Sequence, residues 1–410
     1  MKKVLLNGSD IKSLDEIIIC GSKSESNRVL ILKSIFKNFS IKNLSSSDDT
    51  KILQKSLNSK DFNLNVGHAG TAMRFLTAYL ATQESKKFRL SGSKRMNERP
   101  IGILVKALND LGFNINFIEN EGFPPIEIIG GKNLNSKVKI KPNVSSQFIS
   151  ALMLIAPSLD DGLVIELDGK ITSRPYIDMT LSILNELGIY AKITHNKIII
   201  KSKKDEIVKD NYQVEADWSS ASYFFSIVAL SKNIELSFLN FRKDSFQGDI
   251  NVCKYYELFG VKTKFQNDKL ILKKRNNFNY PKKIIINLKD NPDLAQTIIV
   301  TAFGLNIPTK LTGLSTLKVK ETDRLEALRN ELTNLGASCI IDDESIEFFK
   351  SNKLNKNYII NTYDDHRMAL AFAPLSVVFP VEIHNPKVVS KSFPEFWNIL
   401  EKLNFSIDFV

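Results

Sequence analysis

The sequence predicts an α/β protein built from two similar lobes, and three observations support this prediction. First, 410 residues are too many for one ordinary hydrophobic core. Second, helical patterns that end in glycine or asparagine and lead into an alternating strand recur along the chain. Third, small or polar residues open apolar helices at nearly equal intervals. We therefore expect six repeated units of about 70 residues, each with two helices and several strands, and three units in each lobe.

The recurring helix ends form one series. A glycine just past the last apolar position of a helix is the usual left-handed cap, and asparagine is the other common choice. Strand-like runs follow, for example over residues 113–117 and 261–265. The capping residues, spaced 76, 72, 76 and 68 residues apart, are Gly112, Gly188, Gly260, Gly336 and Asn404.

The helix starts form a second series that alternates with the first. The helices that follow these starts are apolar all round, which predicts burial, whereas the other helices are amphipathic and are expected to cover sheets. A similar helix opens earlier, at residues 24–28. The equivalent positions, 75, 74, 74 and 73 residues apart, are Thr71, Ser146, Ser220, Leu294 and Arg367.

Composition limits the class of protein. The apolar fraction of 43% and charged fraction of 25% are typical of a soluble globular chain. The net charge of +11 permits acidic partners, but the lysines are scattered rather than gathered in blocks. Three distant cysteines without a CxxC motif argue against a disulfide framework and a zinc site. The longest apolar run, residues 368–379, is too short to span a bilayer, and no signal peptide is recognised. We expect a cytoplasmic protein.

Several predicted helix starts combine glycine or hydroxyl residues with cations. In the segment from Gly67 to Arg74, two glycines and small residues lead into a buried helical pattern. A helix N-terminus offers unpaired N–H groups and a partial positive charge, which suits an anion. A tight, well-packed turn is the structural alternative. Cations at related positions of several units indicate more than one phosphate or carboxylate, with surface salt bridges as the alternative; these cations are Lys23, Arg28, Arg99, Arg174, Arg324 and Lys391.

Two acids stand among these cations, Asp293 and Glu321. Each is a candidate for acid–base chemistry, and the structural alternatives are a helix N-cap for Asp293 and a first-turn acid for Glu321. His366 is a candidate proton shuttle or a structural residue. The four histidines are isolated, without a metal-ligand pattern. Residues 21–24 superficially resemble a nucleotide phosphate loop, but Ile17 stands where that motif needs a glycine, and no GxGxxG is present.

Taken in order, these motifs closely resemble the 5-enolpyruvylshikimate-3-phosphate synthase family. The resemblance implies a pseudo-symmetric enolpyruvyl transferase fold of two lobes, each of three βαβαββ units, which close on substrate. It assigns residues 20–212 to a lobe that binds mainly shikimate 3-phosphate, and residues 1–19 with 213–410 to a second lobe, with the active site in the cleft between them. The matching segments are Gly21 to Arg28, Gly67 to Arg74, Arg95 to Gly102, Val144 to Phe148, Ser173 to Asp178, Pro292-Asp293, Lys320 to Leu325, Asp365 to Met368 and Lys391 to Pro394.

The resemblance also implies an activity: transfer of the enolpyruvyl group of phosphoenolpyruvate to the 5-hydroxyl of shikimate 3-phosphate, with release of phosphate and without metal or cofactor. Asp293 would be the base and Glu321 the acid, with Lys23, Lys320 and His366 in support. The implied ligands of shikimate 3-phosphate are Lys23, Ser24, Arg28, Ser145, Ser146, Gln147, Ser173, Tyr176, Asp293, Thr316 and Lys320. Those of phosphoenolpyruvate are Lys23, Gly70, Arg99, Gln147, Arg324, Arg367 and Lys391, whereas Arg74 is expected to support the loop.

The chain departs from the family pattern at three positions. His68 and Thr316 stand where asparagine is usual, and Phe75 stands where many members have proline. Two rival functions are an enolpyruvyl transferase acting on UDP-N-acetylglucosamine, which needs a reactive loop cysteine, and a basic RNA-binding repeat protein, which needs exposed aromatics among basic patches. The sequence favours neither, and we expect a monomer that binds no nucleic acid and no membrane.

Overall fold

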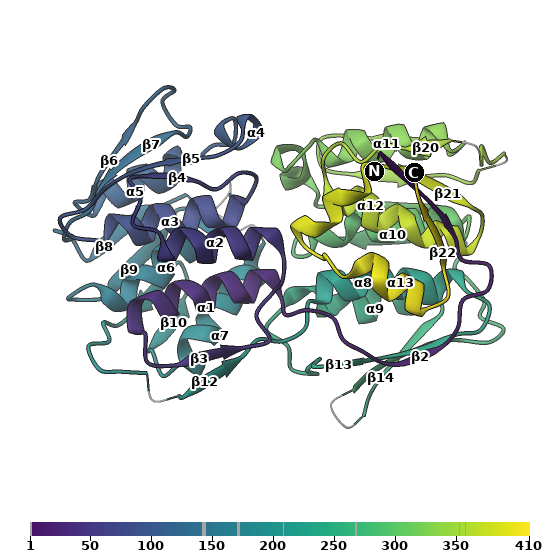
Figure 1. The fold of residues 1–410 in the computed structure, drawn as a ribbon, viewed down its shortest axis with the longest axis horizontal. Helices are drawn as coiled ribbons and strands as arrows, with labels where there is room; N and C mark the ends of the chain where they lie inside the picture. The colour runs from purple at the N-terminus through teal and green to yellow at the C-terminus, as the bar shows by residue number, and fades with distance from the viewer. Residues whose placement is uncertain are drawn as a thin grey trace. The chain divides into compact units, whose positions relative to one another are not determined.

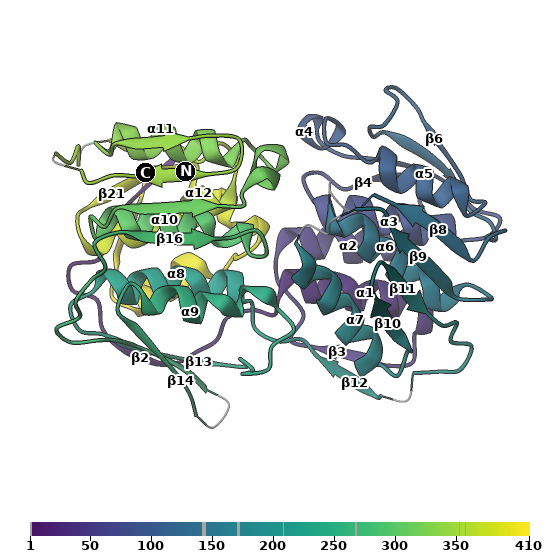
Figure 2. The same cartoon turned by 180° about the vertical axis from the view of Figure 1, so that it is seen from behind.

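The computed structural model describes residues 2–141, 145–169, 173–207, 209–266, 269–351, 353–356 and 358–410. The chain divides into two compact units. We call residues 21–214 the N-terminal unit, and residues 1–20 with 215–410 the C-terminal unit. Within each unit, helices stack side by side and sheets lie around them (Figures 1 and 2).

The N-terminal unit contains three sheets among its described residues, with strand orders β4-β5-β7-β6, β10-β11-β9-β8 and β12-β3. Its elements are α1 (Lys23–Phe36), β3 (Ser40–Lys42), α2 (Asp48–Asn58), β4 (Asn63–Asn65), α3 (Gly70–Ala81), β5 (Lys87–Ser91), α4 (Lys94–Asn97), α5 (Gly102–Asp110), β6 (Asn114–Phe117), β7 (Ile126–Ile129), β8 (Lys137–Ile140), α6 (Ser146–Ile155), the 3₁₀ turn η1 (Ala156–Ser158), β9 (Leu163–Leu167), α7 (Arg174–Glu186), β10 (Ala191–Thr194), β11 (Lys197–Ile200) and β12 (Asn211–Gln213).

The C-terminal unit likewise contains three sheets, with orders β20-β21-β1-β22, β14-β15-β13-β2 and β16-β17-β19-β18. Its elements are β1 (Lys3–Asn7), β2 (Leu14–Ile17), α8 (Trp218–Leu230), β13 (Glu235–Leu239), η2 (Gly248–Asn251), α9 (Val252–Glu257), β14 (Val261–Gln266), β15 (Lys269–Lys274), β16 (Ile284–Asn287), η3 (Pro292–Leu294), α10 (Ala295–Gly304), β17 (Thr309–Thr312), η4 (Ser315–Val319), α11 (Arg324–Asn334), β18 (Cys339–Ile341), β19 (Ile346–Phe348), β20 (Ile359–Ile360), α12 (His366–Phe372), η5 (Ala373–Val377), β21 (Val381–His384), η6 (Pro386–Lys391), α13 (Phe396–Lys402) and β22 (Ser406–Phe409).

One pairing pattern recurs in every four-stranded sheet of the described residues. Each has one parallel pair at an edge, β4/β5, β8/β9, β2/β13, β16/β17 or β20/β21, and two antiparallel pairs beside it. The first two strands of the chain join sheets of the C-terminal unit, where β1 pairs with β21 and β22, and β2 pairs with β13. The repeated topology confirms the predicted α/β fold class of repeated units.

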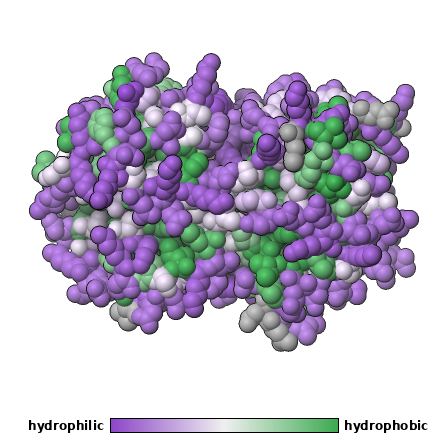
Figure 3. All heavy atoms as spheres, in the orientation of Figure 1, coloured by the Kyte–Doolittle hydropathy of each residue, from purple (hydrophilic) through white to green (hydrophobic). Residues whose placement is uncertain are grey.

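The core consists of the apolar helices that the sequence pattern predicts to be buried. Nearly every residue of α3, α6, α8, α10 and α12 is buried. Each of these helices lacks a polar face, so it must be covered by other elements on all sides. Hydrophilic side chains instead cover most of the face seen in Figure 3, with smaller hydrophobic areas between them. None of the described helices is both long and apolar enough to cross a membrane.

The predicted left-handed residues at helix ends are confirmed. Gly112, Gly188, Gly260 and Gly336 have φ of +101°, +73°, +76° and +98°, and Asn404 has φ of +70°. Each lies just beyond the end of α5, α7, α9, α11 or α13, where it reverses the chain into the next strand. A Cβ added at Gly112 would lie 2.8 Å from the backbone nitrogen of Leu134, whereas one at Gly188 would meet nothing within 4 Å.

Substitutions at these two glycines separate two contributions to the free energy of unfolding: strain of the left-handed backbone, and steric overlap of an added methyl group. Gly188→Ala should lower the free energy of unfolding by about 1–2 kcal/mol, the cost of left-handed backbone for a residue with Cβ. Gly112→Ala should lose at least about 1 kcal/mol more, because its methyl group also overlaps residue 134. Urea unfolding of both variants measures the difference. Equal losses would contradict this account.

Candidate functional site

In the N-terminal unit, polar contacts join the first turns of several helices. Lys23 at the start of α1 lies 3.3 Å from the carboxylate of Asp49 at the start of α2. Gln147 in the first turn of α6 donates from Nε2 to Thr71 Oγ1 in the first turn of α3, at 3.3 Å. The starts of α1 and α2, and those of α3 and α6, therefore lie side by side. Aligned helix starts concentrate N–H groups and positive potential, which favours an anionic ligand.

Arg28 joins α7 to two helices of this arrangement, α1 and α6. Its guanidinium is 2% exposed and donates to Thr180 Oγ1 at 2.8 Å and to Ser150 Oγ at 3.1 Å. It also donates to the carbonyls of Ser24 at 2.7 Å and Tyr176 at 3.1 Å. Burial lowers the pKa of Arg28 to about 10, which leaves it charged at neutral pH. The side chain therefore braces α1, α6 and α7 around the residues expected to bind shikimate 3-phosphate.

The other predicted residues of this unit lie at helix starts. Ser145 is the N-cap of α6, and its hydroxyl accepts from the Gln147 N–H at 3.3 Å. Ser146 is buried in the first turn of α6. Ser173 precedes α7 with φ of +53°, a conformation that is uncommon for a residue with Cβ and is often found at functional sites. Val144, which belongs to one of the matched motifs, lies outside the described residues.

Gly70 and Arg99 form the second feature of this unit. Gly70 is the first residue of α3, and a Cβ built on it would lie 2.8 Å from Arg99 Nη1. The absence of a side chain thus lets the Arg99 guanidinium lie against the helix start. Arg99 Nε is buried and has no hydrogen-bond partner among the described residues. Such a cation beside a helix start is suited to an anionic ligand.

Arg74 and His68 hold this loop in place. Arg74 is 4% exposed and donates to the carbonyls of Gly70 and Pro100, each at 3.1 Å, so it joins the helix start to the segment that carries Arg99. The Nδ1 of His68 lies 3.0 Å from the hydroxyl of Ser93, the N-cap of α4. Arg74 therefore supports the loop from within, whereas His68 does so at the surface.

In the C-terminal unit, Arg324 is the centre of a buried ionic cluster. Its guanidinium is 2% exposed and contacts three carboxylates. Nε donates to Asp365 at 2.6 Å, Nη1 to Asp293 at 3.0 Å and Nη2 to Glu321 at 2.8 Å. Burial lowers the pKa of Arg324, but the three carboxylates raise it by more, so the pKa lies above its usual value. Arg324 is therefore a permanent cation.

Further cations complete the cluster. Arg367 donates from Nη2 to the Asp293 carboxylate and from Nη1 to its carbonyl, both at 3.0 Å. Lys320 lies 3.7 Å from Asp293, and Lys391 donates to Glu321 at 2.9 Å. Burial raises the pKa of Asp293, but Arg367, Lys320 and Arg324 lower it by more, so the pKa lies well below its usual range. The Asp293 carboxylate is ionised at neutral pH.

These contacts exclude the structural alternatives for the two acids. Asp293 lies within the η3 turn before α10, and no side chain caps either helix. Glu321 precedes α11, whose N-cap is Asp323, so it is not a first-turn acid. Both carboxylates bind cations instead, Asp293 with Arg324 and Arg367, and Glu321 with Arg324 and Lys391.

His366 and Thr316 complete the predicted set. His366 begins α12 and is 2% exposed, with Nδ1 3.6 Å from an Asp365 oxygen. Thr316 lies in η4, and its buried hydroxyl has no hydrogen-bond partner among the described residues. No group of three or more His, Cys, Asp or Glu side chains in the described part of the chain could hold a metal ion.

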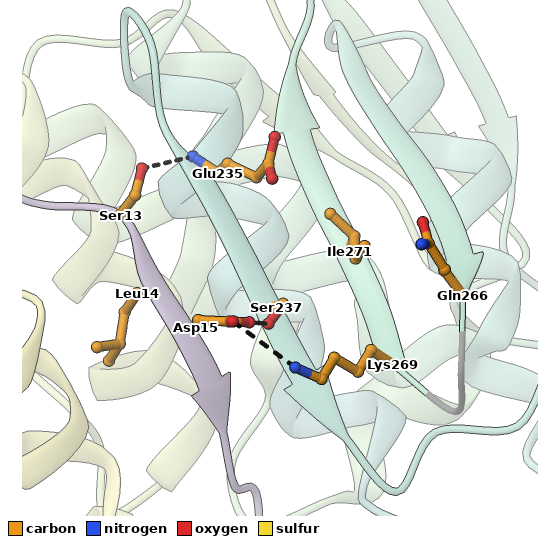
Figure 4. Close-up of a pocket in the computed structure, with 8 residues that line it drawn as sticks. All are labelled: Ser13, Leu14, Asp15, Glu235, Ser237, Gln266, Lys269 and Ile271. Atoms are coloured by element: carbon orange, nitrogen blue, oxygen red, sulfur yellow. Dashed lines mark hydrogen bonds and ion pairs between the residues drawn. The ribbon is translucent and has the colours of Figure 1, made fainter.

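A separate hollow of about 490 Å³ lies on the sheet β14-β15-β13-β2 (Figure 4). Its charged side chains form ion pairs: Lys269 lies 3.6 Å from Asp15, and Glu235 lies 2.9 Å from Lys273 outside the hollow. The hydroxyl of Ser237 donates to Asp15. None of the predicted site residues lines this hollow. The candidate site is therefore formed by the helix starts described above, and this hollow is not part of it.

Sequence reasoning missed three acids of the site: Asp49, Asp249 and the role of Asp365. Asp365 caps α12 by accepting from the Arg367 N–H at 2.9 Å, and an aspartate before an apolar helical run could have indicated this cap. Asp49 follows Ser47, the N-cap of α2, and reads as an ordinary first-turn acid. Asp249 lies in a short 3₁₀ turn, for which the sequence offers no signal.

The fold and the site together define a class: an α/β protein of two similar units, each presenting helix starts suited to anionic ligands. Residues 52–400 match the family model described as EPSP synthase (3-phosphoshikimate 1-carboxyvinyltransferase). The chain belongs to this family, which confirms the resemblance seen in its motifs.

Relatives and solved structures agree with this assignment. The chain is 41% identical to the 3-phosphoshikimate 1-carboxyvinyltransferase of Bacteroides fragilis strain YCH46, with 99% of each chain covered. It is 34% identical to that of Colwellia psychrerythraea, covering 95% of this chain and 96% of the relative. Two structures of EPSP synthase from Acinetobacter baumannii superpose with TM-scores of 0.77 and 0.79, at 20% and 19% identity, over 99% and 100% of this chain and 100% of each structure. These two structures support the fold.

The ionic cluster predicts a particular pH dependence of stability. Because the pKa of Asp293 in the folded state lies below its unfolded value, its carboxylate stabilises the fold above that unfolded value. Asp293→Asn should therefore lower the free energy of unfolding at neutral pH by about 3 kcal/mol, since it leaves buried cations without their partner. The difference from the unmodified chain should shrink as pH falls below about 4. Urea titrations at both pH values test this, and a difference independent of pH would contradict it.

Proposed function

We propose that the chain transfers the enolpyruvyl group of phosphoenolpyruvate to the 5-hydroxyl of shikimate 3-phosphate and releases phosphate. The observation that carries the proposal is the cluster in which Arg324, Arg367 and Lys391 surround the carboxylates of Asp293 and Glu321. Addition of a hydroxyl to phosphoenolpyruvate requires fixed cations for a phosphate and a carboxylate, and an acid and a base beside them. The relatives named above carry this activity in their names.

The two units supply different kinds of ligand. Helix starts of the N-terminal unit present hydroxyls and an amide, from Ser24, Ser145, Ser146, Ser173 and Gln147. These groups suit the hydroxyls and phosphate of shikimate 3-phosphate. Arg28 donates to the carbonyl of Tyr176 and so joins the starts of α1 and α7. Thr316, whose buried hydroxyl has no hydrogen-bond partner in the described part of the chain, suits the same substrate. The family resemblance assigns Lys23, Gly70 and Arg99 of this unit to phosphoenolpyruvate.

Anionic substrate changes the state of the acids. Before it binds, Asp293 and Glu321 neutralise the cations around them. When the phosphate and carboxylate of phosphoenolpyruvate occupy Arg324, Arg367 and Lys391, these cations no longer depress the pKa of Asp293 to the same degree. Asp293 then becomes a better base for the proton of the 5-hydroxyl. Glu321, which takes up a proton from solvent once substrate anions neutralise Arg324 and Lys391, delivers that proton to the methylene carbon. Loss of a methyl proton back to Glu321, with breakage of the C–O bond to phosphate, then completes the transfer. We assign supporting roles to the buried His366, which lies 3.6 Å from Asp365, and to Lys320, which lies 3.7 Å from Asp293.

The rival transferase that acts on UDP-N-acetylglucosamine needs a reactive thiolate. Burial raises the pKa of Cys253 to about 12, and it raises that of Cys339 to about 12 as well. Both thiols therefore stay protonated at neutral pH, which does not suit a nucleophile. Cys20 is half-buried and lies between β2 and the start of α1. A cytoplasmic location and a monomeric state stay predictions.

Purified protein supplied with both substrates should release phosphate, and neither substrate alone should support release. Lys23→Met should abolish turnover while it shifts the thermal midpoint by only a few degrees, because the lysine is half-buried and makes one ion pair, with Asp49. Phosphate release and a thermal melt measure the two effects. The proposal is refuted if the folded, unmodified protein shows no release above background.

Gly70→Ala tests whether the position of Arg99 beside Gly70 matters for the binding of phosphoenolpyruvate. The added methyl would lie 2.8 Å from the Arg99 guanidinium, and this flexible side chain would move rather than the backbone. The KM for phosphoenolpyruvate should rise by about tenfold or more, whereas the KM for shikimate 3-phosphate and the thermal midpoint should change little. Gly131→Ala is the matched control, since its methyl would meet nothing within 4 Å. An unchanged KM in Gly70→Ala would show that Arg99 does not need this space.

A further inference from the structure

Asp249 is a buried carboxylate beside the proposed base that none of the steps above uses. It lies in η2 and is 7% exposed. One oxygen accepts from the hydroxyl of Ser219, in the first turn of α8, and the other accepts from Asn291 Nδ2 at 3.3 Å. The carboxylate is thus held between two elements, each of which leads to Asp293.

The first route passes through Ser219 and Arg367. Arg367 Nη2 donates to Ser219 Oγ at 3.4 Å and to Asp293 Oδ2 at 3.0 Å. Because Ser219 gives its only proton to Asp249, its lone pairs face Arg367. Because of Asp249, Ser219 therefore accepts a hydrogen bond from the Arg367 guanidinium. This hydrogen bond fixes the direction of Arg367 Nη2.

The second route passes through Asn291. This residue is 1% exposed and precedes η3, the turn that contains Asp293, and its carbonyl accepts from the Leu294 N–H at 3.1 Å. Its side-chain oxygen accepts from Asn251 at 3.0 Å and from Tyr255 at 3.1 Å, which leaves its amide to donate to Asp249. The turn that carries the base is therefore anchored to the same carboxylate.

A negative charge at this position is costly for the fold. Burial raises the pKa of Asp249 to about 6, with the neighbouring Asp293 adding to the effect, so its ionised form is destabilised near neutral pH. A neutral amide of the same size would remove this penalty.

We propose that Asp249 is a positioning residue of the transfer reaction, which orients Arg367 through Ser219 and anchors the turn of Asp293 through Asn291. The proposal rests on the proposed function, because it assigns Arg367 to phosphoenolpyruvate. The titratable and charged groups that face Asp249 are Asp293 in η3, Arg367 in α12, Asp217 at the start of α8 and Tyr255 in α9. As pH falls through about 6, the carboxylate gains a proton, Ser219 no longer needs to donate to it, and the orientation of Arg367 is lost.

Three variants test this assignment. Asp249→Asn should raise the KM for phosphoenolpyruvate by about tenfold, the effect of one lost hydrogen bond to a charged group, with the KM for shikimate 3-phosphate within about twofold. Ser219→Ala should give a similar rise, and the double variant should add little, because both act through one network. Glu215→Gln is the control: Glu215 is 2% exposed and has a pKa raised by burial, but it bonds to Trp218, Ser245 and Gln247 rather than to the site.

Two readouts separate positioning from a merely structural role. The KM for phosphoenolpyruvate of the unmodified chain should rise as pH falls through about 6, and this rise should be smaller in Asp249→Asn, where the phosphate of the substrate still titrates but residue 249 does not. The thermal midpoint of Asp249→Asn at about pH 8 should equal or exceed that of the unmodified chain, because the variant removes a buried charge. An unchanged KM, or an unchanged pH profile with a lowered midpoint, would overturn the assignment of Asp249. Loss of turnover in the unmodified chain would instead refute the proposed function.

Discussion

The contacts of Arg324 with three carboxylates are the interaction on which the candidate site depends. One guanidinium fixes the relative positions of the α12 start through Asp365, the η3 turn through Asp293 and the segment before α11 through Glu321. Each of these elements starts a helix, so each also brings a partial positive charge to the same place. Without the carboxylates, the cations and helix starts would repel one another, and burial would add a large desolvation penalty. The acids therefore make an anion site compatible with a stable fold.

The two units stabilise their buried cations in different ways. In the N-terminal unit, helix starts present mostly neutral groups, and the buried Arg28 is satisfied by hydroxyls and carbonyls rather than by carboxylates. In the C-terminal unit, cations and acids alternate around Arg324. Neutral donors and acceptors suit a polyhydroxylated ring that is bound and released, whereas paired charges suit a reaction in which charge develops and protons move. We therefore propose that the same repeated fold serves recognition in one unit and chemistry in the other.

The sequence predicted those features that depend on local backbone physics. The series from Gly112 to Asn404 was predictable because left-handed caps need glycine or asparagine, and buried helices such as α10 were predictable because they lack a polar face. The residues of the site were predicted from motif resemblance, and their contacts were not. Whether Asp293 caps a helix or binds arginines depends on Arg324 and Arg367, which are distant in sequence. The network of Asp249 was missed for the same reason, since it joins four elements through side chains that no local pattern relates.

The central claim is that the cations around Arg324 are kept for anionic substrates, with Asp293 and Glu321 as temporary partners. Glu321→Gln tests it most directly, because loss of the acid should stop turnover and leave both substrates intact on the protein. The measurement is the thermal midpoint of this variant with and without shikimate 3-phosphate and phosphoenolpyruvate. The account predicts that the midpoint rises, and rises further with both substrates than with either alone, since ligands that bind the folded state stabilise it. A midpoint that does not respond to the two substrates together would contradict the account.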